Sequence, residues 1–483
     1  MISEFIDGYW PHSAATLSIL ISITATIHAS LTKRDVRSAA GWVGVIWLSP
    51  FLGALAYYLL GINRIRRRAV RLRARGSRSP TQDIPESSLA VRGAVTAMSP
   101  HLSQLRRLVN RVTHQPLTQG NRIEPLMGGD AAYPAMLEAI AAAERTIALG
   151  SYIFDLDRIG RQFVDALADA RRRGVEVRVL LDAVGSHYSR PPVTHELRAR
   201  DVTVGLFMQT RVPWRLAYAN MRTHRKMLIV DGQVGFAGGM NIREAFASVD
   251  GNTHTQHDIH FKIEGPVVAH IGEVFAQDWA FTTGEVLDDD DWFPELHDFD
   301  DGVLARGVAS GPDRPIEGTH MVLMGALAVA QRRVRILSPY FLPDQQLIGA
   351  LAVAAQRGVE VDIIVPEKNN LRLVQWASTA QLRHVIRPGC SVWLQPEPFN
   401  HSKLMVIDDL WSYFGSSNWD PRSLRLNFEF DIEVYDPGVA GHLDAHIDAI
   451  LSRSKRLSLD AVNSRGFVKK VRDSTVWLAS PYL

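Results

Sequence analysis

The stretch MRTHRKMLIVDGQVGFAGGMN, residues 221–241, and the stretch NHSKLMVIDDLWSYFGSSN, residues 400–418, share one spacing pattern, His-x-Lys-x4-Asp-x6-Gly-[Gly/Ser]-x-Asn. The first copy places the pattern on His224, Lys226, Asp231, Gly238 and Asn241. The second copy places it on His401, Lys403, Asp408, Gly415 and Asn418. Two complete copies of one pattern in a single chain indicate a duplication rather than a chance match.

The surroundings of the two motifs repeat as well. The run RGVEV occurs at residues 173–177 and again at 357–361, each time after a helical pattern and at the start of a β-rich run. Further β-rich runs at residues 142–154 and 331–341 precede the two helical patterns. This alternation is typical of βαβ units with a buried parallel sheet. We therefore expect an α/β fold built from a duplicated domain, with mixed, mainly parallel sheets flanked by helices.

The residue types in the motif predict phosphoryl-transfer chemistry. On a strand, residues two apart face the same way, so each His and Lys share one face and the Asp faces the other. We interpret the His and Lys as chemical groups and the two Asp residues as support. Phosphoryl transfer without a metal needs a nucleophile, a proton donor for the leaving oxygen and fixed positive charge. Two half-sites supply all three, with the asparagines as further donors to oxygen, so we expect neither a metal nor a cofactor.

Composition and charge limit the class of protein. The 483 residues are 46% hydrophobic, which suffices for two or three domains with packed cores. The single cysteine, Cys390, excludes an internal disulfide and fits a reducing compartment. The net charge is +2, but residues 64–78 contain eight arginines and no acid, so the remainder of the chain is net acidic. That remainder is unlike the usual basic surface of nucleic-acid-binding proteins, and we expect no nucleic-acid partner.

Two apolar runs near the N-terminus predict membrane helices. Residues 40–62 carry no charge and would span about 34 Å as a helix, enough to cross a bilayer. Residues 13–31 form a weaker run, and Glu4 and Asp7 before it do not fit a signal peptide, which begins with basic residues. The arginines at 64–78 favour a cytoplasmic location for the remainder of the chain. We expect a multi-pass protein of the cytoplasmic (inner) membrane with its catalytic domain in the cytoplasm.

These patterns predict five segments along the chain. They are two transmembrane helices in 1–63, a basic collar and linker in 64–120, a first repeat in 121–284, an acidic linker in 285–315 and a second repeat in 316–483. The linker contains an amphipathic helical pattern with Leu102, Leu105, Val109 and Val112 on one face. This helix either packs on the following domain, which we favour, or lies on the membrane surface.

At the paired motifs the chain resembles the phospholipase D superfamily, and most closely the bacterial cardiolipin synthases. Matching stretches include YIFDLDRIG at 152–160, SPYFLPD at 338–344 and GSSNWDPRSLRLNFEFDIEVYD at 415–436. The resemblance implies duplicated phospholipase D-like domains in a membrane-bound phosphatidyltransferase. It further implies a reaction that joins two phosphatidylglycerol molecules into cardiolipin, releases glycerol and passes through a phosphohistidine. Its partners would be phospholipid substrates and membrane lipids.

The resemblance also implies roles for individual residues. Asp258, in HDIHFKIEGP, and Glu429, in LNFEFDIEV, occupy positions where family members have an acid that orients a catalytic imidazole. By the same resemblance, His224 is the nucleophile. His401 is then the acid that protonates the departing glycerol and later the base that activates the incoming hydroxyl.

Three alternatives compete with this interpretation. A phospholipase D-type hydrolase, or a transphosphatidylase with another acceptor, would use the same phosphohistidine and pass it to water or to a different hydroxyl. A nuclease of the superfamily would share both motifs but would not need membrane helices. A membrane scaffold without catalytic activity would be expected to have lost a motif His or Lys, and all four are present.

Overall fold

The computed structural model describes residues 2–33, 36–61, 89–188, 190–209, 221–248, 256–312 and 318–480. The chain forms two compact units, Met1–Arg68 with Thr210–Asn220, and Ala69–Gln209 with Met221–Leu483. The basic collar expected at 64–78 lies outside the described residues.

The N-terminal unit is helical. It contains α1 (Ile2–Thr32), α2 (Val36–Leu48), α3 (Pro50–Ala56) and a π-helical turn at Tyr57–Gly61. In the described part of this unit, one helical segment, His12–Thr32, is both long and apolar enough to cross a bilayer. The expected span at 40–62 is not one continuous helix, because it is divided at Pro50, where a new helix begins. Proline lacks the backbone N–H that would continue the preceding helix, and its ring crowds the preceding turn.

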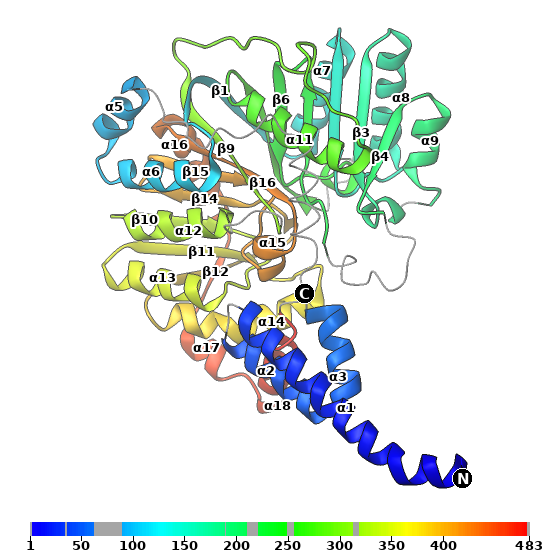
Figure 1. Cartoon of the computed structure of the whole chain (residues 1–483). Coiled ribbons are helices and arrows are strands. Elements are labelled where there is room, and N and C mark those ends of the chain that lie inside the picture. Colours follow the sequence, from blue (N-terminus) through cyan, green and yellow to red (C-terminus); the bar gives the residue numbers. More distant parts are fainter. Residues whose placement is uncertain are drawn as a thin grey trace. The chain divides into compact units, whose positions relative to one another are not determined.

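The second unit is organised around one fifteen-stranded sheet (Figure 1). The first half of the chain contributes β1 (Thr118–Met127), β2 (Thr146–Ser151), β3 (Glu176–Asp182), β4 (Thr203–Phe207), β5 (Met227–Val230), β6 (Val234–Gly238) and β8 (Ile259–Glu264). The second half contributes β9 (Val303–Ser310), β10 (Arg333–Leu337), β11 (Glu360–Pro366), β12 (Ser391–Gln395), β14 (Leu404–Ile407), β15 (Trp411–Gly415), β16 (Glu429–Tyr435) and β17 (Lys455–Leu457). A separate parallel pair joins β7 (Gln256–His257) to β13 (Phe399–Asn400).

The strand order displays the duplication. Across the sheet it runs β17-β12-β11-β10-β14-β15-β16-β9-β1-β8-β6-β5-β2-β3-β4. Apart from the edge strand β17, the order reads the same from both ends when each strand is matched to its counterpart, with β9 and β1 meeting at the centre. The two repeats therefore share one continuous sheet rather than forming separate sheets.

The expectation of a mainly parallel sheet is wrong. Parallel pairing joins β2 to β3 and β3 to β4, and likewise β10 to β11 and β11 to β12. The other neighbouring strands of the described sheet pair antiparallel, including β5 with β6 and β14 with β15. The strands of each motif, β5 with β6 and β14 with β15, form a β-hairpin. A short turn joins only antiparallel strands, because parallel neighbours need a long crossover connection.

Helices cover both faces of the sheet. One face of the first repeat packs against α7 (Gly129–Ala142), α8 (Arg158–Arg172) and α9 (Val193–Ala199). The matching face of the second repeat packs against α5 (Leu89–Met98), α6 (Leu102–Thr113), α12 (Gly318–Val329), α13 (Gln345–Gln356) and α14 (Arg372–Ile386). The other face of both repeats packs against α11 (Val268–Thr283) and α16 (Pro437–Leu451). The remaining helices are α15 (Pro421–Arg425), α17 (Leu459–Asn463), α18 (Phe467–Trp477) and the 3-10 turns Gly185–His187 and Glu244–Phe246.

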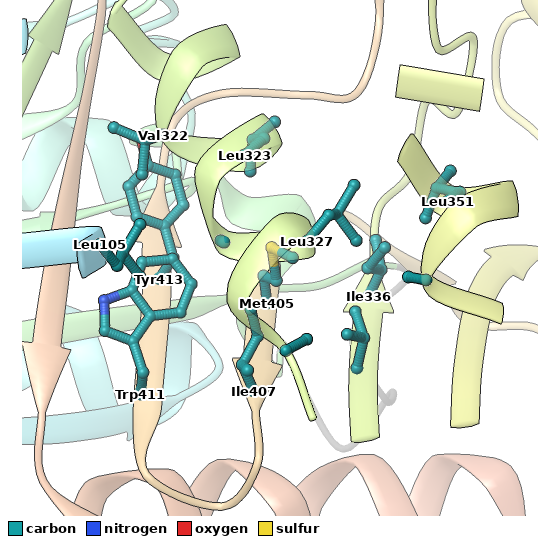
Figure 2. Packing of buried hydrophobic residues seen from close by; sticks show 14 of the residues in the cluster. Leu105, Val322, Leu323, Leu327, Ile336, Leu351, Met405, Ile407, Trp411 and Tyr413 are labelled. Atoms are coloured by element: carbon teal, nitrogen blue, oxygen red, sulfur yellow. The ribbon is translucent and has the colours of Figure 1, made fainter. Parts of the chain in front are cut away.

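The helix expected in the linker packs on the second repeat. Leu102, Leu105 and Val109 of α6 are buried, and Leu105 belongs to the same hydrophobic cluster as Val322 and Leu323 of α12 (Figure 2). Asn110 of α6 also accepts a hydrogen bond from the buried Arg306 of β9. The helix therefore packs on the fold, as favoured, but on the second repeat rather than on the domain that directly follows it in the chain.

The segment 285–315, which was expected to be an acidic linker, is only partly a linker, because residues Val303–Ser310 form strand β9. This strand lies at the centre of the sheet as the counterpart of β1, and Arg306 within it forms a fully buried ion pair with Glu433 of β16. Trp411 and Tyr435 donate to the second oxygen of Glu433, at 3.0 and 3.1 Å. We therefore propose that the second repeat begins at β9.

Candidate active site

Both motif histidines lie where the two repeats meet. The backbone N–H of His224 donates to the carbonyl of Phe428, and the N–H of His401 donates to the carbonyl of His257, at 2.9 and 2.7 Å. In each case the acceptor immediately precedes the acid named by the family resemblance, Glu429 or Asp258. These backbone hydrogen bonds thus place each histidine next to the acid of the other repeat.

The side chains follow the same crossed arrangement. His224 Nδ1 lies 3.0 Å from Oε2 of Glu429, and His401 Nδ1 lies 2.8 Å from Oδ2 of Asp258. A proton on each Nδ1, donated to the carboxylate, leaves Nε2 with a free lone pair. Each pair therefore has the geometry in which an acid fixes the tautomer and orientation of an imidazole.

The charge state of these pairs follows from burial and mutual attraction. Burial, together with Lys403, lowers the pKa of His401 to about 3, although Asp258 opposes the shift. Burial also lowers the pKa of His224, against the attraction of Glu429. Burial would raise the pKa of Asp258 and Glu429, but the histidine partners and nearby lysines outweigh it and lower both. Carboxylates beside neutral imidazoles are the favoured resting state.

Lys226 and Lys403 bring the positive charge of the site. Both are buried, and each ammonium group donates to the carbonyl of the histidine two residues earlier. Burial lowers the pKa of Lys226 to about 7 and that of Lys403 to about 8, although nearby carboxylates oppose the shift. An anion bound beside them would favour their charged forms.

The motif aspartates lie away from this centre and stabilise the backbone. Asp231 accepts the N–H groups of Glu144, Arg145 and Thr146 at 2.7–3.0 Å, before and at the start of β2. Asp408 accepts the equivalent N–H groups before and at the start of β10, those of Gln331, Arg332 and Arg333, at 2.8–2.9 Å. These contacts agree with their interpretation as supporting residues.

The two motif asparagines are also buried. Asn241 Oδ1 accepts the N–H of Ile153 at 3.1 Å. Asn418 Nδ2 donates to Ser423 at 3.3 Å, and its Oδ1 is buried without a hydrogen-bond partner in the described structure. Asn241 is thus oriented by the turn after β2, and Asn418 by α15.

The two halves differ at the residue after the motif glycine. In the first repeat this residue is Gly239, and a side-chain carbon there would lie 2.7 Å from Asp258 and 3.1 Å from Lys403. In the second repeat it is Ser416, whose hydroxyl donates to Glu429 Oε2 at 2.6 Å. A glycine therefore makes room for one crossed pair, while a serine hydroxyl strengthens the other.

Sequence reasoning missed several residues that position the site. The sequence pattern gives position 416 only as Gly or Ser, although the Ser416 hydroxyl donates to an acid of the centre. Sequence reasoning also passed over Asp182, a buried residue at the end of β3 that accepts the N–H of Thr223 at 3.1 Å. A carboxylate at the C-terminal end of a buried strand was the available signal.

Aromatic rings border both histidines. The Tyr152 ring meets His224 edge-on at 5.3 Å between centroids, and Tyr340 meets His401 edge-on at 6.0 Å. Ser151 and Ser338 are equivalent positions in the two repeats. Tyr152 is one residue after Ser151, whereas Tyr340 is two residues after Ser338. Because of this offset of one residue, the equivalence of Tyr152 and Tyr340 is not visible in the sequence.

Paired imidazoles with carboxylate partners, beside two buried lysines and between two repeats of one fold, form the arrangement that the resemblance to the phospholipase D superfamily implies. The family described as "Cardiolipin synthase, PLD-like domain" matches residues 136–279 and 323–451, more than half of the chain. The family described as "Phospholipase_D-nuclease N-terminal" matches residues 20–61.

Individual relatives agree with these matches. The chain is 30% identical to cardiolipin synthase A of Pseudomonas entomophila over 470 residues, covering 96% of each protein. It is also 30% identical to the cardiolipin synthase of Geobacillus kaustophilus, covering 99% of this chain and 96% of that one. The chain belongs to the cardiolipin synthase family of the phospholipase D superfamily.

A solved structure shares the fold. The phosphatidylserine synthase of Haemophilus influenzae has a TM-score of 0.61 and 16% identity, covering 78% of this chain and 100% of that one.

The lowered lysine pKa values predict an alkaline limit to activity. Each lysine is charged below its pKa and loses that charge as the pH rises through it. We therefore expect kcat/KM, which reports groups of the free enzyme, to fall more steeply as the pH rises through about 7 to 8, beyond the slope that comes from protonating the imidazole that acts as the acid. An exposed lysine, Lys368, provides the control, because Lys368→Gln should leave the profile unchanged. A kcat/KM profile without this added slope up to the ordinary lysine pKa, about 10.4, would contradict the lowered values.

Proposed function

We propose that the enzyme makes cardiolipin by transferring a phosphatidyl group from one phosphatidylglycerol to the hydroxyl of another, with release of glycerol. The crossed histidine–carboxylate pairs are the observation that carries the proposal, because they offer two oriented imidazoles in one buried centre. The names of the relatives support the choice of product.

In the first half-reaction, Nε2 of one histidine attacks phosphorus. A nitrogen–phosphorus bond forms, the bond between phosphorus and the glycerol oxygen breaks, and the second imidazole supplies the proton that this oxygen needs. The second imidazole must therefore enter the step protonated. The negative charge of the bound phosphodiester opposes the effect of burial and favours that protonation.

In the second half-reaction, the same neutral imidazole removes a proton from the hydroxyl of the incoming phosphatidylglycerol. The hydroxyl oxygen attacks phosphorus, the nitrogen–phosphorus bond breaks and cardiolipin leaves. Lys226 and Lys403 hold the non-bridging oxygens, on which negative charge grows in both transition states. The side-chain amides of Asn241 and Asn418 are further donors.

We further propose that the N-terminal unit anchors the enzyme in the cytoplasmic membrane as two passes. The helix His12–Thr32 supplies one pass, and α2 with α3 supplies the other across the break at Pro50. Proline breaks are tolerated in membrane helices when neighbouring groups satisfy the freed backbone. The arginines at 64–78 favour a cytoplasmic catalytic unit.

Product analysis tests the proposed reaction. Purified full-length protein, incubated with phosphatidylglycerol labelled in both the acyl chains and the headgroup glycerol, should yield cardiolipin and free glycerol in equal amounts. The His401→Asn protein, prepared in parallel, controls for contaminating activity. Release of glycerol with phosphatidic acid in place of cardiolipin would identify a hydrolase and refute the proposal.

We expect the two histidines to have unequal roles, with His224 as nucleophile and His401 as acid and base. His401→Asn should still form phosphohistidine from a phosphatidyl nitrophenol ester, because nitrophenolate leaves without a proton. His224→Asn should form none from any substrate. Acid-labile label that survives base would be mapped by peptide analysis, and label on the His401 peptide would reverse the roles.

A further inference from the structure

The C-terminal helix α18 exposes an apolar face. Phe467, Val468, Val471 and Leu478 are 80%, 79%, 47% and 72% exposed. Phe467, Val471 and Leu478 follow the spacing i, i+4 and i+11, which places them on one side of the helix. A surface helix normally turns its apolar side inward, so these residues form an apolar face that the fold itself does not use.

The opposite side of α18 packs on the second repeat. Asp473 is buried and paired with Arg465 and Arg472, at 2.6 and 2.7 Å. The guanidinium group of Arg472 also lies 4.1 Å from the ring centroid of Trp376 in α14, the helix beside α18 (Figure 1). The helix is thus firmly held in the orientation that exposes its apolar face.

The charges around this face are basic. Residues 465–478 contain four basic side chains and one acid, and that acid is the buried and paired Asp473. Lys470, three residues after Phe467, is exposed beside the face, whereas Lys469, two residues after Phe467, is exposed on the other side of the helix. An apolar face with a lysine at its edge, on a helix whose exposed charges are basic, is the pattern of a helix that lies in the interface of an anionic bilayer.

The packed side of α18 is also connected to the active site. Val476 of α18 packs with Leu342, Val374 and Tyr340, and the Tyr340 ring contacts His401. Leu371 and Leu373, at the start of α14, are each about half exposed. They follow Asn370, which accepts the Tyr340 hydroxyl at 3.0 Å. Two exposed apolar side chains therefore lie close in sequence to a residue that binds the ring bordering His401.

We propose that α18, with Leu371 and Leu373, is a second membrane contact that rests on the surface of an anionic phospholipid bilayer. The contact would hold the part of the fold that carries Tyr340, beside His401, close to the lipids from which the headgroups are drawn. It is additional to the N-terminal helices, and it depends on the proposed function only for the identity of the substrate lipid.

Fluorescence quenching tests the contact without measuring turnover. Full-length protein in vesicles of phosphatidylcholine and phosphatidylglycerol would carry a nitrobenzoxadiazole label at Val468→Cys or, as the control, at Val286→Cys. Val286 is 48% exposed and lies in the acidic stretch after α11. Cys390 can remain, since it is buried and burial raises its pKa to about 12, which suppresses labelling.

We expect nitroxide lipid labelled near the headgroup to quench the Val468 probe several-fold more strongly than the Val286 probe. Equal quenching at both positions would overturn the proposal. So would a Val468 probe that is shielded from water but not quenched by nitroxide lipid, since a second copy or the N-terminal helices would then cover α18. An enzyme that failed to make cardiolipin would leave this measurement intact, so the two proposals fail separately.

A paired activity measurement separates docking from folding. Phe467→Ser with Val468→Ser should lower kcat/KM on vesicle phosphatidylglycerol by about tenfold, because two apolar side chains no longer enter the interface. Activity on dihexanoyl phosphatidylglycerol, present as monomers, should be unchanged, as should both activities of the control Val286→Ser. Equal losses on vesicles and monomers would indicate a structural effect and contradict the proposal.

Discussion

The active site depends on each histidine being held by the carboxylate of the other repeat. His224 is oriented by Glu429 and His401 by Asp258, so neither repeat contains a complete pair. The continuous sheet, the β7–β13 pair and the bridge between Thr223 and Phe428 all fix this exchange. Burying two carboxylates costs free energy unless they are hydrogen-bonded, and the crossed contacts supply those hydrogen bonds. The duplication is thus a requirement of the chemistry as well as a feature of the sheet.

The exchange leaves room for the two halves to differ. Asp258 is short and reaches its histidine because Gly239 has no side chain to block it. Glu429 is longer and is further bound by the hydroxyl of Ser416 and the amide of Asn427, at 2.6 and 3.1 Å. Such differences in the partners of two equivalent imidazoles give a physical basis for unequal roles in one reaction, since hydrogen bonding to the acid tunes the imidazole that it orients.

Much of the site could be predicted from the sequence because it lies within the motifs. The expected separation of His224 and Lys226 from Asp231 is observed, but not through alternation along one strand: the first two precede β5 and Asp231 follows it, where it binds the backbone before β2. The crossing of the pairs could not be predicted, because the spacing from Asn241 to Asp258 does not reveal which histidine the acid meets. The parallel sheet was predicted from the two βαβ units, whose patterns are long, whereas the hairpin strands are too short to give a clear pattern.

The uncharged run of 23 residues at 40–62 predicts one continuous helix, although Pro50 within it favours a break.

The crossed pairing is tested most directly by asking which histidine variant has the same activity losses as each acid variant. For Asp258→Asn, Glu429→Gln, His401→Asn and His224→Asn, two quantities would be measured relative to the unaltered protein: single-turnover release of nitrophenol from a phosphatidyl nitrophenol ester, and formation of cardiolipin from phosphatidylglycerol. Crossed pairs predict that Asp258→Asn matches His401→Asn and that Glu429→Gln matches His224→Asn, whichever histidine is the nucleophile. A match of Asp258→Asn to His224→Asn would contradict the account, because each acid would then serve the histidine of its own repeat.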